Sequence, residues 1–172
     1  MELDVRPMRL EETSLVIDYF HSSTSEHLEM LGVDPTRLPS RDAWASMFDA
    51  QYALPLEERR AFFLIWLMDS HPIGFSSCDK IVFGVQANMH LHVTQPALRQ
   101  RGIGAQCVRL GVDVYFRMLQ IDQLFCEPNA FNVSPNRTLQ RAGFRYLKTH
   151  ITVPGPLNFH QAVNRWVYER QA

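Results

Sequence analysis

A turn rich in glycine and arginine lies directly ahead of an apolar helical pattern. Residues 98–108 read LRQRGIGAQCV, and apolar residues then recur at helical spacing to about residue 119. The first N–H groups of a helix have no intrahelical acceptor and carry the positive end of its dipole, so this position suits an anion. Gly102 and Gly104 lack the Cβ atoms that would hold a phosphate away, and Arg99 and Arg101 add positive charge. The alternative is an ordinary tight turn, because neither the P-loop nor the three-glycine dinucleotide pattern is present.

Composition narrows the class of protein. The 172 residues are enough for one core, so we expect a single domain over residues 1–172. The 17 Lys and Arg nearly balance the 18 Asp and Glu, which argues against a nucleic-acid or membrane partner. Three widely spaced cysteines without a CxxC pair argue against a metal site or a disulfide framework. The first residues have no signal-peptide core and the apolar run at 61–68 is too short to span a bilayer, so we expect a cytoplasmic protein.

Strand and helix patterns alternate in a way that predicts a mixed α/β sheet. Strand patterns lie at residues 3–8, 61–68, 72–78, 87–93, 121–127, 144–153 and 164–170, and helical patterns at 11–22, 41–60, 103–119 and 134–143. For the last helix we expect Ser134 as N-cap, Pro135 as first helical residue and Gly143 as the left-handed residue that ends it. Residues 22–41 read as a long loop broken by helical turns, and such loops are usually functional.

Two motifs resemble those of a known family. The segment RQRGIG at 99–104 resembles the acetyl-CoA signature of the GCN5-related N-acetyltransferases (GNAT), Gln/Arg-x-x-Gly-x-Gly/Ala. Asn132, ahead of Gly143 and Phe144, resembles the companion signature. The resemblance implies the GNAT fold, a mixed and mostly antiparallel sheet with flanking helices and one splayed pair of strands. It also implies an N-acetyltransferase in which a primary amine of a small molecule or a peptide N-terminus attacks acetyl-CoA directly, without a metal. A homodimer stays open.

The resemblance assigns the cofactor contacts residue by residue. The strand before the turn is expected to bind the pantetheine arm through its main chain, and the turn to bind the pyrophosphate. The residues concerned are Leu91, His92 and Val93 for the arm, Arg99, Gln100, Arg101, Gly102, Ile103, Gly104 and Ala105 for the pyrophosphate, and Asn132 and Asn136 for further contacts with coenzyme A. The two asparagines could instead satisfy N–H groups at the start of a helix.

The segments around 90–104 and 126–144 look most like the branch of aminoglycoside 6'-N-acetyltransferases, siderophore-lysine acyltransferases and ribosomal-protein acetyltransferases. The resemblance places the catalytic base at His90 and its carboxylate partner at Glu127, where relatives carry Asp. A histidine titrates near neutrality and a carboxylate can orient it. Either residue could instead be structural. Leu139 stands where many relatives have a Tyr that protonates the leaving thiolate, so that acid is unassigned.

Two matters stay open at this level. A non-catalytic acyl-CoA-binding module would keep the glycine turn but would not need His90 or Glu127, and a nucleotide-binding regulator is a weaker reading. The acceptor site is expected to involve residues 22–41, where Glu26, Glu29 and Asp34 would favour a cationic acceptor near His27. A solvated loop face fits them equally well. The aromatic residues of 44–66 are expected to form core rather than a substrate cage.

Overall fold

The computed structural model describes residues 1–99 and 101–171. Its centre is a seven-stranded sheet in the order β1-β2-β3-β4-β5-β7-β6. Neighbouring strands are antiparallel except β4 and β5, which are parallel. The strands are β1 (Leu3–Pro7), β2 (Phe62–Met68), β3 (His71–Val82), β4 (Gln86–Val93), β5 (Gln123–Cys126), β6 (Arg145–Thr152) and β7 (Gln161–Glu169). The predicted mixed and mostly antiparallel sheet is confirmed.

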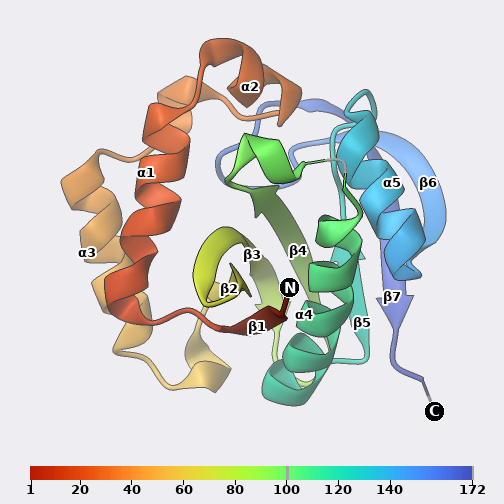
Figure 1. Cartoon of the computed structure of the whole chain (residues 1–172), viewed down its shortest axis with the longest axis horizontal. Helices are drawn as coiled ribbons and strands as arrows, with labels where there is room; N and C mark the ends of the chain where they lie inside the picture. Colours follow the sequence, from red (N-terminus) through yellow and green to blue (C-terminus); the bar gives the residue numbers. More distant parts are fainter. Residues whose placement is uncertain (100, 172) are drawn as a thin grey trace.

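Helices cover both faces of the sheet (Figure 1). They are α1 (Ser14–Ser22), α2 (Ser25–Met30), α3 (Arg41–Tyr52), α4 (Ile103–Leu119) and α5 (Val133–Ala142), with short 3-10 turns η1 (Leu10–Thr13), η2 (Pro35–Arg37), η3 (Leu56–Glu58) and η4 (Pro96–Leu98). Figure 1 shows α1 and α3 on one side of the sheet and α4 and α5 on the other. No helix among residues 1–99 and 101–171 is long and apolar enough to cross a membrane.

The strand β2 feeds two cores, because successive side chains of a strand point to opposite faces. Phe62, Leu64 and Trp66 are buried in the cluster that includes α4 and α5. Ile65 and Leu67 are buried in the cluster with α1 and α3. This explains why the run at 61–68 is apolar without interruption: both faces of the strand are covered.

The pair β4 and β5 separates partway along its length. Pairing runs from Gln86 opposite Gln123 to Met89 opposite Cys126, where β5 ends. The strand β4 continues for four more residues to Val93, paired only with β3 along that stretch. This opening is the splayed pair that the family resemblance implies.

Three local expectations need correction. The strand β3 runs on to Val82 instead of ending near residue 78, with a register shift between Asp79 and Val82. The helix α5 begins at Val133 with Asn132 as N-cap, so Ser134 lies inside its first turn and Pro135 is its third residue. Helix ends are set by backbone conformation, and Asn132 is the last extended residue. Gly143 ends the helix with φ 100, as expected.

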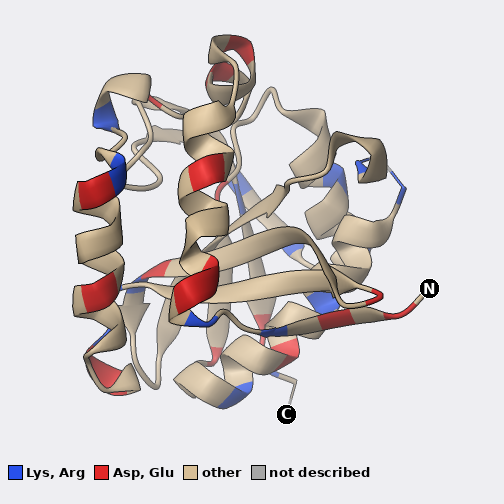
Figure 2. Cartoon of the chain, turned by 60° about the vertical axis from the view of Figure 1, so that its left-hand side comes forward, with Lys and Arg blue, Asp and Glu red and all other residues tan. Residues whose placement is uncertain are grey.

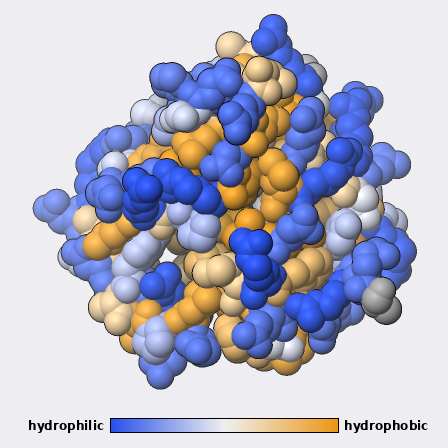
Figure 3. All heavy atoms as spheres, turned by 60° about the horizontal axis from the view of Figure 1, so that its bottom comes forward, coloured by the Kyte–Doolittle hydropathy of each residue, from blue (hydrophilic) through white to orange (hydrophobic). Residues whose placement is uncertain are grey.

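Charges of both signs are interspersed over the surface. Figure 2 shows Asp and Glu distributed over α1, α2 and α3, and basic residues around the turn that precedes α4. Figure 3 shows hydrophobic residues reaching the surface in patches between hydrophilic ones. The basic residues at the turn are therefore a local feature of this end of α4.

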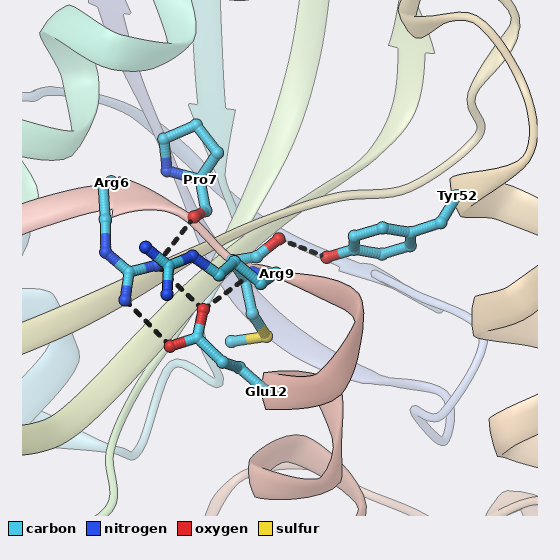
Figure 4. Close-up of polar contacts among 6 residues, drawn as sticks. Arg6, Pro7, Arg9, Glu12 and Tyr52 are labelled. Atoms are coloured by element: carbon cyan, nitrogen blue, oxygen red, sulfur yellow. Dashed lines mark hydrogen bonds and ion pairs between the residues drawn. The ribbon is translucent and has the colours of Figure 1, made fainter.

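A carboxylate near the N-terminus joins β1 to the first helical turn (Figure 4). Glu12 accepts hydrogen bonds from both terminal nitrogens of Arg6, each at 2.8 Å, and from the Arg9 N–H at 2.8 Å. These bonds, that from Arg6 above all, lower the pKa of Glu12 to about 2. The hydroxyl of Tyr52, at the end of α3, donates to the Met8 carbonyl at 2.7 Å. The contacts hold α1 and α3 at one edge of the sheet.

We expect Glu12→Gln to lower the free energy of unfolding by about 1–2 kcal/mol at neutral pH, the scale of a lost charge-assisted pair that is partly exposed. The folded-state pKa is below that of an unfolded Glu, so the contribution is present above about pH 4.3 and is lost as the pH falls toward about 2. Denaturant titrations at neutral pH and at about pH 2 check this. The variant Glu11→Gln, at an exposed residue, is the control. An equal loss for both variants, or one independent of pH, would contradict it.

Candidate functional site

The turn before α4 presents bare backbone at a helix start. Gly102 is the N-cap, and its φ of 76 lies in the left-handed region that favours glycine. Gly104 has a different reason to be glycine. A Cβ there would lie 3.4 Å from Thr138 and 4.0 Å from Val93, which is ordinary contact, so packing within the chain does not require glycine. The glycine at position 104 is better explained by the space that it leaves open for a bound group at the start of α4.

The remaining residues of the turn contribute in different ways. Arg99 donates from Nε to the Val93 carbonyl at 3.1 Å, which fixes its side chain beside the open edge of β4. Arg101 is exposed. Ile103 and Ala105 are buried in the core, so they can offer only their main chain to a ligand. Gln100, also assigned to the cofactor, lies outside the described residues.

The two-residue alternation of β4 decides which main-chain groups face the opening. Thr94 donates its N–H to Ile73 of β3, and His92 is paired with Phe75 of β3. Leu91 and Val93 therefore direct their N–H and C=O groups to the other edge, where β5 has ended. Of the three main-chain contacts expected from sequence, Leu91 and Val93 face the opening, and the main chain of His92 faces β3.

The two asparagines at the start of α5 differ in what they can do. Asn132 is buried beside the cavity described below, and its side chain makes no helix-capping hydrogen bond. Asn136 is fully engaged: its Oδ1 accepts from Trp166 at 2.9 Å and Asn164 at 3.0 Å, and its Nδ2 donates to two carbonyls. The structure thus favours Asn132 for a ligand and gives Asn136 a structural role.

A cavity of about 390 Å³ opens between β4, β5 and the layer of α1 and α3. Its polar end includes Asp79, His90, Glu127 and Asn132. Its other end is apolar and is called here the aromatic chamber; the chamber consists of Phe20, Trp44, Phe48, Phe63 and Phe75. The aromatic residues are buried or nearly so, as expected for core, but they also line this cavity.

The predicted base, His90, has a different partner from the one expected. Its Nε2 donates to Asp79 Oδ1 at 3.0 Å, and both side chains are partly buried. A Cβ added to Gly155 would lie 3.0 Å from His90 Cε1, so the backbone of the β6–β7 loop packs against the ring. With Nε2 carrying the proton toward Asp79, Nδ1 is the ring atom that could accept one.

Glu127 lies in the same cavity but is occupied elsewhere. His150 Nε2 donates to its Oε2 at 2.6 Å, and Arg165 Nη1 lies 3.3 Å from the same oxygen. Asn88 donates to its Oε1 at 3.4 Å, and the Glu127 side chain is 5% exposed. A buried carboxylate needs such compensation. The expected pair of His90 with Glu127 is therefore wrong as a hydrogen bond, although one cavity holds both residues.

Sequence reasoning missed Asp79, although a signal was present. In the β3–β4 pairing Ser77 lies opposite His90, so Asp79 is its diagonal neighbour two residues along. Reading residues 72–93 as one hairpin, with the turn at 82–86, would have brought the two side chains to the same face. The expectation that residues 72–78 form a separate short strand hid this register.

His92 lies on the wall of the cavity among aromatic rings. The ring centroids of Tyr19, Phe20 and Phe75 are each 5.1 Å from that of His92. Its Nδ1 is buried and finds no hydrogen-bond partner among the described residues. Burial above all, with positive neighbours second, lowers the pKa of His92 to about 3. His92 is therefore neutral at physiological pH.

Residues 22–41 reach the cavity with apolar side chains. Leu31, Val33 and Pro39 line it, together with Arg37. The four polar residues expected there lie elsewhere: Glu26 and Glu29 are exposed on α2, His27 hydrogen-bonds Tyr19, and Asp34 accepts from Thr36. Residues 22–41 therefore do not line the cavity with the acidic side chains that the sequence suggests.

The β6–β7 loop closes the cavity over that segment. Asn158 and Gln161 both donate to the Gly32 carbonyl, at 2.9 and 2.8 Å, and the Asp34 N–H donates to the Leu157 carbonyl at 2.8 Å. A Cβ at Gly32 would lie 2.0 Å from Gln161 Oε1, so the contact requires glycine. Pro154, Pro156, Leu157 and Asn158 line the cavity from this loop.

The cysteine thiols near the site are not activated. Burial raises the pKa of Cys126 and Cys78, both of which line the cavity. A thiol must ionise to become a nucleophile, and burial in apolar surroundings opposes this. Direct attack by an amine fits the site better than a covalent cysteine intermediate.

Comparison with known proteins agrees with this geometry. A model of the acetyltransferase (GNAT) domain matches residues 2–145. No curated protein matches the chain by sequence. Three solved structures illustrate the similarity of fold. The aminoglycoside acetyltransferase AAC(6')-Ib in complex with coenzyme A has a TM-score of 0.72 and 16% identity over 98% of this chain and 95% of that chain.

Spermidine N-acetyltransferase from Vibrio cholerae, in complex with CoA and spermine, has a TM-score of 0.77 and 12% identity over 97% and 95% of the two chains. Ribosomal-protein-S5-alanine acetyltransferase from Vibrio fischeri has a TM-score of 0.74 and 13% identity over 98% and 93%. At these identities the structural similarity concerns the fold. Because the family model covers most of the chain, the protein belongs to the GNAT family of acetyltransferases, as its two motifs predict.

Proposed function

We propose that this acetyl-CoA-dependent N-acetyltransferase uses His90, oriented by Asp79, to deprotonate a primary amine that attacks the thioester directly. The observation that carries the proposal is the single cavity that adjoins both the open edge of β4 and the pair of Asp79 and His90. Direct transfer needs a bound thioester, a proton acceptor and an amine held in line with the carbonyl. A purely acyl-CoA-binding module would need no such pair.

In this proposal the cofactor lies along the opening between β4 and β5. The main-chain groups of Leu91 and the N–H of Val93, whose carbonyl is bonded to Arg99, bind the pantetheine arm. The N–H groups at the start of α4 bind the pyrophosphate. Arg99 and Arg101 add charge beside the phosphates, and Asn132 offers a free side-chain amide near the thioester end. The cofactor supplies the activated acetyl group.

The proton leaves the amine as follows. The acceptor enters as an ammonium, and His90 Nδ1 takes one proton while Nε2 stays bonded to Asp79. The neutral amine adds to the thioester carbonyl, a C–N bond forms, and the C–S bond breaks as the tetrahedral intermediate collapses. The coenzyme A thiolate leaves, and the second proton of the attacking nitrogen passes to that thiolate, which gives the neutral amide and the free thiol. Leu139 is fully buried and has no proton to give, so it has no part in this step. We also propose that the enzyme acts in the cytoplasm. Its acceptor in this proposal is a small-molecule or peptide amine and not a nucleic acid.

Replacing Gly104 with valine tests the phosphate site. We expect Gly104→Val to raise the Kd for acetyl-CoA by about tenfold or more, because the new methyl groups occupy space at the exposed helix start. Gly111→Ala in the same helix is the control, since its Cβ meets only ordinary contacts within the core. Calorimetry on both folded variants decides: unchanged affinity in Gly104→Val rejects the phosphate site.

Four substitutions, at His90, Asp79 and Glu127, separate the roles of the two carboxylates of the cavity. We expect His90→Ala to lower kcat by about a hundredfold or more, the usual scale for a lost general base, with little change in KM for acetyl-CoA. Asp79→Asn should lower kcat about tenfold, and Asp79→Glu should restore part of it. Added imidazole should partly rescue His90→Ala and leave Asp79→Asn unchanged.

Glu127→Gln is the matched comparison. Because Glu127 is bound by Arg165 and His150, its loss should show in the free energy of unfolding more than in kcat. Steady-state kinetics with any accepted amine and denaturant titrations provide the data. A wild-type rate in His90→Ala removes His90 from the mechanism. A larger loss of kcat in Glu127→Gln than in Asp79→Asn would return the partner role to Glu127.

A further inference from the structure

The cavity as a whole is much larger than an acetyl group needs. Five aromatic side chains from α1, α3, β2 and β3 form the aromatic chamber, and Val16, Leu31 and Leu157 extend its wall. A volume of about 390 Å³ lies within the range of sites for small molecules. Such sites are mostly apolar with a few placed polar groups, which is the composition found here.

The carboxylates that line the cavity can compensate the charge of one bound cation. Among the described residues that line it, Asp79 and Glu127 are the carboxylates. Glu127 is already compensated by Arg165 at 3.3 Å and His150 at 2.6 Å. Asp79 has His90, which is neutral when it acts as a base. A second or third ammonium of one acceptor would therefore be buried without a counter-charge, which is strongly unfavourable.

Neighbouring residues do not change this balance. Among the described lining residues Arg37 is the further charged side chain, and it is positive; its Nε lies 3.7 Å from Asp34 Oδ2. The acidic residues Glu26 and Glu29 are exposed on α2 and are not among the described residues that line the cavity. His92, beside Phe20 and Phe75, is neutral at physiological pH. The chamber is thus apolar and uncharged, and the acid group lies at its edge.

We propose that the acceptor is a primary amine on a single apolar group, aryl or alkyl, whose ammonium lies beside the pair of Asp79 and His90 while the apolar group fills the aromatic chamber. This rests on the function proposed above, since it identifies the acceptor of the same site. An apolar group could also arrive on a longer acyl-CoA. The carboxylate at the chamber's edge favours the amine, because an acyl chain carries no cation to pair with Asp79.

Initial rates with acetyl-CoA and a matched set of amines test the proposal. Ethylamine, butylamine, hexylamine and 2-phenylethylamine vary only the apolar group, and spermidine and kanamycin add charge. Each buried methylene should raise kcat/KM by about threefold to fourfold, from the usual free energy of burying one CH₂. We expect 2-phenylethylamine to exceed ethylamine by at least about thirtyfold, and both polycations to be poorer than hexylamine.

Two phenylalanine variants locate the effect. Phe48→Leu, in the chamber, should lower the ratio of kcat/KM for 2-phenylethylamine over ethylamine by about fivefold or more. Phe62→Leu is the matched control, because Phe62 is equally buried but belongs to the core around α4. Its ratio should stay at the wild-type value. Equal ratios in both variants would overturn the assignment of the chamber.

The remaining outcomes separate this inference from the proposed function. If spermidine or kanamycin is the better acceptor, the inference is wrong and the acetyltransferase stands. If hexanoyl-CoA surpasses acetyl-CoA with ethylamine, and larger amines give no gain, the chamber binds the acyl chain. If no amine reacts, calorimetry of 2-phenylethylamine with the full chain distinguishes the cases: binding that weakens in Phe48→Leu supports the chamber alone, and absence of binding overturns both.

Discussion

The separation of β4 from β5 beyond Met89 and Cys126 is the constraint on which the other parts of the site depend. Main-chain N–H and C=O groups inside a protein need partners, and a strand edge exposed by such an opening lacks them until a ligand or water arrives. The same opening sets the start of α4, because the chain must turn away from β4 to reach it. The glycine turn, the free helix N–H groups and the open edge therefore lie along one path. A linear cofactor with an anionic end and an amide-containing arm matches that path.

Electrostatics divide the two carboxylates at the polar end. Glu127 is almost fully buried and has both a guanidinium and an imidazole, so it behaves as part of the framework that joins β5, β6 and β7. Asp79 is more exposed, and His90 is its one side-chain partner among the described residues. A carboxylate with spare capacity beside a titratable ring can respond to an arriving cation, whereas a saturated one cannot. This difference follows from the contacts each group makes and not from its residue type.

Much of this arrangement could be predicted from the sequence because it depends on local rules. Glycines before an amphipathic pattern predict the turn at 99–104, and the order of elements predicts a mixed sheet. The partner of His90 could not be read in the same way. It depends on the register of β3 and β4, which shifts between Asp79 and Val82, where Lys80 has φ 46. The partners of Asn136 could not be predicted either, since its hydrogen bonds to Asn164 and Trp166 come from a strand some thirty residues later. The spacing of residues along the chain predicts turns and secondary structure well. It predicts poorly which side chains become partners across a sheet.

The contact between Gly32 and the β6–β7 loop has a consequence for assembly of the protein. The donors Asn158 and Gln161 are 126 and 129 residues away from Gly32 along the chain, among the longest separations in the fold. Long-range contacts of this kind form late, because they require closing most of the chain into a loop. During synthesis the cofactor turn would be complete while the last hairpin is still in the ribosome. We therefore expect the cavity that this loop lines to be the last part of the fold to be completed.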